Sequence, residues 1–138
     1  MVYDELGAGF EERHIQTALG IELTKNNIKF LREVSIEVFY KSHPLGLFEL
    51  DFLIYPCMDL NEPVIIETKV RDKLNDGSRQ QLKNYLRSAS LNNNETLKKV
   101  EKGILINFKV QTIVYIHIYF LNVITFFYFF CTFATFSA

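Results

Sequence analysis

The sequence predicts an α/β fold in which helices cover one mixed β-sheet. A length of 138 residues suits one domain with a single core. Apolar residues recur at helical spacing in two segments and alternate with polar residues in others. The resulting order of helix, three strands, helix and strand indicates an α/β or α+β sandwich around one sheet.

The first expected element is a helix over residues 10–25. Ile15, Leu19 and Leu23 recur at the spacing of one helix face. Glu12 precedes Ile15 by three residues and so lies on this apolar face, which is an unusual place for a carboxylate.

Three strands are expected next. Alternating residues over 30–40 predict a half-buried strand, and residues 43–46 (His-Pro-Leu-Gly) predict a turn. A second strand over 47–55 would complete a hairpin, and a third is expected over 64–70.

The second half of the charged region predicts a helix and a buried strand. Asp76 or Ser78 can cap a helix that ends near Ala89. A polar, Asn-rich stretch over 91–99 predicts a loop or short helix, and 103–108 (GILINF) predicts a buried strand.

Three charged residues fall where a sheet would be apolar: Asp51, Glu67 and Lys69, in a D-x(15)-E-x-K pattern. Glu67 and Lys69 share one face of the third strand because side chains alternate along a strand. Pairing of the second and third strands would bring Asp51 beside Glu67, and Mg²⁺ or Mn²⁺ suits two such carboxylates. Lys69 could then hold the attacking water, which predicts metal-dependent phosphodiester hydrolysis. The alternative is an edge strand on which Glu67 and Lys69 form an ordinary surface pair.

A second pair of polar residues lies on the helix that follows. Gln81 and Tyr85 are four residues apart and share one face. An amide and a phenol held together can bind a phosphate, although both residue types are common in amphipathic helices.

Charge divides the chain into unlike parts. Residues 1–68 carry five basic and twelve acidic side chains, whereas residues 69–109 carry ten basic and four acidic ones. The basic part could attract a polyanion or form a solvated helix face. Cys57 and Cys131 form no metal or disulfide pattern, and the acidic N-terminus is not a signal peptide, so we expect a cytoplasmic location.

Residues 110–138 form an uncharged tail that contains ten of the twenty aromatic residues. A stretch over 111–138 is long enough to cross a membrane, but no Lys or Arg follows it. A frame-shift product, a membrane anchor and an extra buried hairpin remain open for this tail. The domain boundary is expected at residue 109.

Five blocks in one order resemble a known family. They are GFEERHIQTAL, LFELDFLI, VIIETKV, QQLKNYL and GILINF. Together they look like the GxxExxY proteins of the PD-(D/E)XK nuclease superfamily over residues 2–109. Gly9 and Glu12 fit the GxxExxY signature, but its final Tyr is Ile15 here.

The resemblance implies a restriction-endonuclease-like mixed sheet core (α-β-β-β-α-β) flanked by helices. It also implies that Asp51, Glu67 and Lys69 occupy catalytic positions, with Asp51, Glu67 and Glu12 as metal ligands. Gln81 and Tyr85 resemble the QxxxY motif of the RecB-like branch. The expected function is therefore a nuclease that uses Mg²⁺ or Mn²⁺, with DNA favoured over RNA. A catalytically inactive nucleic-acid-binding or interaction module on the same scaffold is the alternative.

Overall fold

The computed structural model describes residues 11–57, 59–71, 73–108 and 114–120, the last of these by backbone alone. The elements follow the order α2 (Glu12–Lys25), β1 (Phe30–Tyr40), β2 (His43–Ile54), β3 (Val64–Lys69), α3 (Asp76–Ala89), a 3₁₀ turn η1 (Leu97–Lys99), β4 (Lys102–Phe108) and β5 (Val114–Phe120). The predicted α/β order is confirmed, and the sheet continues into β5.

The five strands form one mixed sheet in the order β1-β2-β3-β4-β5. β1, β2 and β3 pair antiparallel, β3 and β4 pair parallel, and β5 returns antiparallel to β4. The parallel pair requires a crossover, which α3 supplies. Because β2 and β3 are antiparallel, the end of β3 lies beside an inner part of β2, and the chain continues from there into α3.

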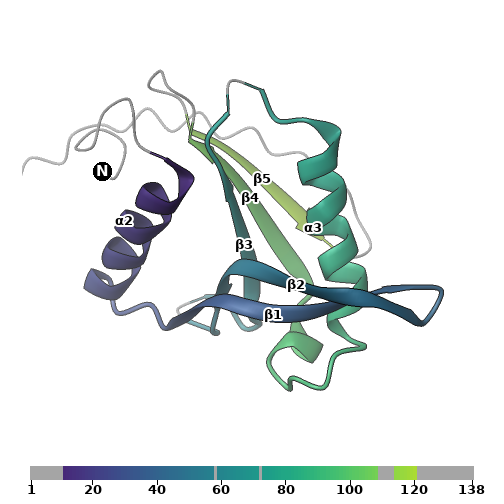
Figure 1. The fold of residues 1–138 in the computed structure, drawn as a ribbon. Coiled ribbons are helices and arrows are strands. Elements are labelled where there is room, and N and C mark those ends of the chain that lie inside the picture. Colours follow the sequence, from purple (N-terminus) through teal and green to yellow (C-terminus); the bar gives the residue numbers. More distant parts are fainter. Residues whose placement is uncertain (1–10, 58, 72, 109–113, 121–138) are drawn as a thin grey trace, which may run out of the picture.

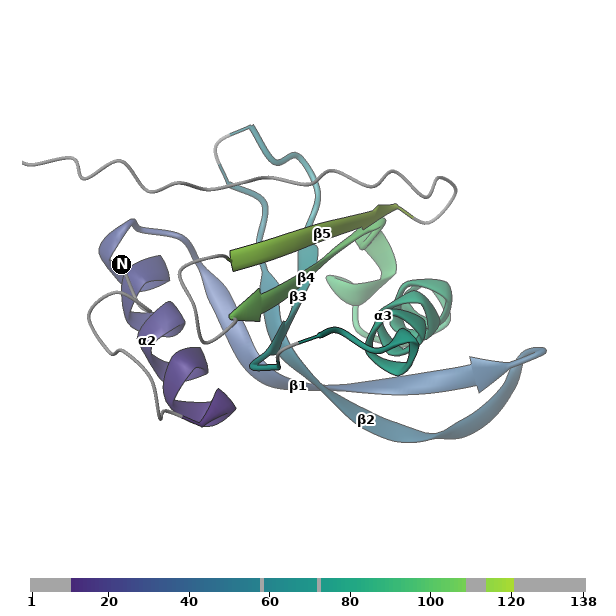
Figure 2. The same cartoon turned by 90° about the horizontal axis from the view of Figure 1, so that it is seen from above.

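The two helices lie on opposite faces of the sheet, with α2 on one side and α3 on the other (Figures 1 and 2). On the α3 side, twelve buried residues from the sheet, α3 and η1 form the larger core, which includes Leu53, Ile65, Leu82 and Leu105. On the α2 side, Phe52, Ile54, Val64 and Ile66 pack against partly buried residues of α2 such as Leu19 and Leu23. The burial of both sheet faces explains why β3 is apolar at successive positions rather than at alternate ones.

One glycine determines how closely α3 approaches the sheet. A Cβ atom at Gly103 of β4 would lie 2.7 Å from Leu82 Cδ1 and 3.0 Å from Leu82 Cγ. Leu82 is fully buried in the α3-side core, so any larger residue at position 103 would push the helix outward.

The β1–β2 hairpin changes the face to which its side chains point. Phe30 packs in the α2-side core, whereas Ile36 and Val38, also at even positions, pack on the α3 side. Glu33, between them, has a positive φ of 53°, and its opposite residue Asp51 has no ladder partner in β1. This left-handed residue reverses the alternation, so Asp51 lies where the hairpin crosses from one face to the other.

The hairpin turn lies two residues earlier than the sequence predicts. Tyr40 pairs with His43, and the two residues between them, Lys41 and Ser42, both have positive φ, of 47° and 65°. This geometry is that of a two-residue type I′ turn, which matches the twist of the strands. The predicted turn at 43–46 is therefore wrong, because these residues belong to β2. The register shifts by one residue between Val38 and Phe39, which leaves Leu45 of β2 as the unpaired residue of a bulge.

The cap of α3 also differs from the prediction of Asp76 or Ser78. Asn75 has an extended backbone, and its Oδ1 accepts hydrogen bonds from Ser78 N at 2.9 Å and from Ser78 Oγ at 3.1 Å. Asp76 is already helical and pairs with Arg79 instead. The cap is Asn75 because the first residue before the helical turn is the one whose side chain can reach the free amides.

Side chains from the end of α3 protect the outer edge of β1. Asn92 Oδ1 accepts from Glu37 N at 2.9 Å, while Asn92 Nδ2 donates to Glu37 O at 3.0 Å. Ser88 Oγ accepts from Phe39 N at 3.0 Å. These two side chains thus provide hydrogen-bond partners for backbone groups of Glu37 and Phe39 on the edge strand β1.

β5 lies in the segment that the sequence analysis assigns to the uncharged tail. Its pairing with β4 runs from Phe108 opposite Val114 to Lys102 opposite Phe120, so the sheet extends past the predicted boundary at 109. Residues 121–138, and with them the choice between a frame-shift product, an anchor and a hairpin, lie outside the described residues. No helix within the described ranges is long and apolar enough to cross a membrane.

Candidate active site

β2 and β3 separate at the point where the predicted acidic residues lie. Their ladder ends at Phe52 opposite Ile66, so one further step would place Asp51 opposite Glu67. At this point side-chain carboxylates, instead of backbone carbonyls, accept the hydrogen bonds of the backbone amides. Glu67 Oε1 accepts from Asp51 N at 3.1 Å, and Asp51 Oδ2 accepts from Thr68 N at 2.7 Å. The predicted neighbourhood of Asp51 and Glu67 is therefore present, held by main-chain amides.

Glu67 is a buried carboxyl with a strongly altered acidity. Its side chain is 2% exposed. Burial and, second to it, the nearby charge of Asp51 raise the pKa of Glu67 to about 8, although the amide of Asp51 and the charge of Lys69 act in the opposite direction. Two carboxyls this close favour a shared proton or a shared cation over two free negative charges.

Lys69 completes the E-x-K motif and contacts the first helix. Its Nζ lies 3.3 Å from Glu12 Oε1, and the lysine side chain is largely buried. Glu12 also contributes a small repulsion to Glu67. The apolar-face position of Glu12 is thus explained by its direction toward the end of β3, where it neutralises Lys69.

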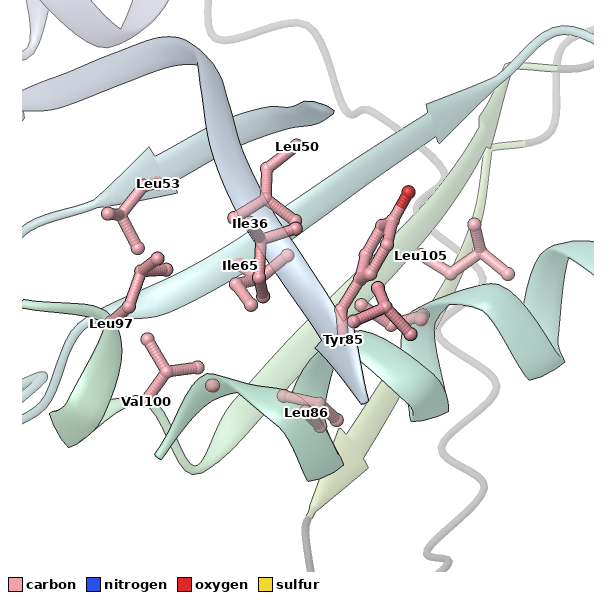
Figure 3. Packing of buried hydrophobic residues seen from close by; sticks show 12 residues of the cluster. Ile36, Leu50, Leu53, Ile65, Tyr85, Leu86, Leu97, Val100 and Leu105 are labelled. Atoms are coloured by element: carbon pink, nitrogen blue, oxygen red, sulfur yellow. The ribbon is translucent and has the colours of Figure 1, made fainter. Parts of the chain in front are cut away.

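The Gln81 and Tyr85 side chains meet on α3, as their spacing predicts. Gln81 Nε2 donates to the Tyr85 hydroxyl at 2.6 Å. Tyr85 is buried among Ile36, Leu50 and Leu105, with its hydroxyl directed away from Leu86 (Figure 3). Burial and, second to it, the charge of Glu67 together raise the pKa of Tyr85 to about 12. The phenol therefore keeps its proton, and it lies close enough to Glu67 for the two groups to interact electrostatically.

A chain of hydrogen bonds from α2 and β1 reaches Asp51, and the sequence analysis did not identify it. Arg32 Nη2 donates to Gln16 Oε1 at 3.3 Å, and Gln16 Nε2 donates to Thr68 Oγ1 at 3.0 Å. Thr68 Oγ1 in turn donates to Asp51 Oδ2 at 2.9 Å. Every donor points toward the carboxylate, so the chain orients Asp51. The available signal was that Gln16 follows Glu12 by four residues, on the same helix face.

A buried asparagine fixes the chain just after Lys69. Asn107 of β4, which pairs with Lys69, accepts from Arg71 N at 3.0 Å and donates to Arg71 O at 2.8 Å. The side chain continues the hydrogen bonding between the two strands as far as Arg71, two residues beyond the end of β3. This contact limits the freedom of Lys69 at the end of its strand.

The arrangement of carboxylates suits a divalent cation that keeps part of its water shell. Asp51 Oδ1 and Glu67 Oε2 make no hydrogen bond to other described residues, so each carboxylate retains a free oxygen. Mg²⁺ is commonly held by one or two carboxylates together with water and phosphate. Within the described residues, no group of three or more His, Cys, Asp and Glu side chains is placed to hold a metal ion. The pair Asp51 and Glu67 fits the ion, and Glu12 as a third ligand stays a prediction.

Paired carboxylates, a lysine and an amide–phenol pair are thus present around the point where β2 and β3 separate in this α/β fold. A family model described as the PD-(D/E)XK nuclease superfamily matches residues 1–117. The match covers most of the 138 residues, and the chain belongs to this superfamily. Searches of curated proteins and of solved structures found no significant match. Membership supports a nuclease-type function on nucleic acid in general, and nucleases of this superfamily generally use divalent metals.

Proposed function

We propose that this protein is a metal-dependent nuclease that hydrolyses phosphodiester bonds, with DNA as the favoured substrate, and that it belongs to the GxxExxY group. One observation carries the proposal: Asp51 and Glu67 lie side by side where β2 and β3 separate, each with one carboxylate oxygen that no other described residue hydrogen-bonds. The charged form of such a buried pair is costly without a cation, which supports a binding role rather than a structural one.

Asp51 and Glu67 are the proposed ligands of Mg²⁺ or Mn²⁺, with Glu12 as an accessory ligand. A bound divalent ion would supply Lewis acidity to a phosphate oxygen and a more acidic water. Lys69 is proposed to hold the attacking water or to neutralise the negative charge that develops on phosphorus. The ion pair with Glu12 limits the motion of Lys69.

Gln81 and Tyr85 are proposed to bind the phosphate. Because the Tyr85 oxygen accepts the hydrogen bond from Gln81, the tyrosine proton is available to a phosphate oxygen. A pKa of about 12 keeps that proton in place over the working range of an enzyme. Tyr85 therefore acts as a hydrogen-bond donor and not as a base.

The test uses the purified full chain with labelled DNA and RNA in Mg²⁺ or Mn²⁺. We expect Lys69→Ala to lower the cleavage rate by at least about 100-fold. Lys99→Ala, which removes an exposed lysine of η1, should leave the rate unchanged. Equal cleavage by the Lys69 variant would contradict the proposed role. Binding of nucleic acid without cleavage and without Mn²⁺ uptake would favour the inactive binding module. We propose a cytoplasmic location for the protein under both functions.

A further inference from the structure

A large aromatic side chain is exposed beside the candidate site. Phe48 of β2 is 45% exposed, although it shares a strand face with Leu50 and pairs with Ile36, both of which are fully buried. Its ring lies against that of Tyr85, with centroids 6.3 Å apart and planes inclined by 57°. One side of the Phe48 ring is thus supported by the protein, while much of the rest faces solvent.

The support for Phe48 is part of the proposed catalytic machinery. Tyr85 receives the hydrogen bond from Gln81 and senses the charge of Glu67. Along β2, Phe48 precedes Asp51 by three residues, which is roughly 10 Å at the rise of a β-strand. A separation of this order leaves the ring within reach of a base next to a phosphate held at Asp51 and Tyr85.

We propose that Phe48 stacks on an unpaired nucleobase adjacent to the cleaved phosphate, so that the substrate is single-stranded nucleic acid or a frayed end. The proposal rests on the proposed function and names the substrate class of the same site. An aromatic ring binds a base through its face, and in a duplex both faces of each base are covered by neighbouring bases. A duplex presents only phosphates and base edges to Phe48, and its phenyl ring has no polar group with which to bind them.

The chain contains no tryptophan, which allows a direct assay of stacking. Phe48→Trp introduces a single tryptophan at the proposed platform, which is excited selectively over the tyrosines. The full chain is titrated without divalent metal, using single-stranded oligothymidylate and a duplex of equal length. Stacking on thymine is expected to quench the fluorescence for the single strand and not for the duplex. Leu47→Trp is the matched control: Leu47 is the preceding residue on the opposite strand face and is 74% exposed. Quenching that is equal at both positions, or equal for both oligonucleotides, overturns the proposal.

Binding of the single strand to variants without tryptophan provides the second measurement. Phe48→Ala should weaken binding by about 5- to 100-fold, the usual range for one stacked base, and Phe48→Tyr should retain it. Unchanged binding by Phe48→Ala overturns the stacking role. Since no cleavage is measured, the two proposals fail separately. Selective quenching without nuclease activity would contradict the proposed nuclease function but support the base-stacking site. Cleavage without selective quenching, and with unchanged binding by Phe48→Ala, would contradict the base-stacking site alone.

Discussion

Replacement of Glu67 by glutamine should stabilise the metal-free protein, and the gain should grow with pH. The pKa of Glu67 is raised from 4.5 to about 8 by burial and by Asp51. Between these two values the folded protein retains a proton that the unfolded chain has released. The folded state therefore loses stability as the pH rises through this window. Glutamine keeps an oxygen that can accept from Asp51 N but carries no proton to lose.

The size of the effect follows from the two pKa values. A rise from 4.5 to about 8 corresponds to about 5 kcal/mol of unfolding free energy lost across the window. The variant should therefore differ little from wild type near about pH 4.5 and exceed it by several kcal/mol above about pH 8. Such a gain on removal of a site residue is typical of sites whose residues favour function over stability.

The assay is urea unfolding followed by circular dichroism at a series of pH values, with EDTA present. Glu49→Gln provides the control, because Glu49 is an exposed carboxylate on the neighbouring strand β2. A difference between Glu67→Gln and wild type that stays below about 1 kcal/mol and does not change with pH would refute the reasoning. Added Mn²⁺ should reverse the order, since only wild type keeps both carboxylates for the ion.

Three further predictions concern the support of the site and the sheet. Thr68→Val removes the hydroxyl that donates to Asp51 and should lower Mn²⁺ affinity by about 10- to 100-fold in calorimetric titrations, with Thr68→Ser restoring it; equal affinities would exclude a positioning role. Gly103→Ala forces a Cβ atom to 2.7 Å from Leu82 Cδ1 and should cost about 1–3 kcal/mol of stability, read as a lower urea midpoint at unchanged slope. Asn92→Ala leaves both backbone groups of Glu37 without their partner, so hydrogen exchange at Glu37 N should accelerate and the open edge should promote association at high concentration. A monomeric variant with unchanged exchange would show that Asn92 does not protect β1.

The elements and their order were predictable because they depend on short-range patterns. Helical spacing located α2 and α3, and alternation located β1 and most of β2. The period of two along a strand placed Glu67 and Lys69 on one face, and the four-residue spacing of Gln81 and Tyr85 placed them in contact. The turn was mislocated because Lys41 and Ser42 are not the residues that usually adopt positive φ, whereas the Pro-Leu-Gly run that follows resembles a turn.

The support of Asp51 could not be predicted from local patterns. Arg32, Gln16 and Thr68 come from β1, α2 and β3, and only the packing of α2 on the sheet brings them into one chain. The reversal of faces at Glu33 is equally hidden, because no sequence pattern marks a non-glycine residue for a positive φ. Both features depend on where the sheet twists and which helix covers it.

The sequence by itself determined the kinds of element, the acidic motif and the residues that share a face, since each follows from the geometry of a single helix or strand. The tertiary structure alone decided that β2 and β3 separate at Asp51 and Glu67, that burial raises the pKa of Glu67 to about 8, and that Lys69 meets Glu12. These properties depend on distances between segments far apart in the chain and on how much water the packed layers exclude. Electrostatic energy is sensitive to both, and neither is encoded by spacing along the sequence.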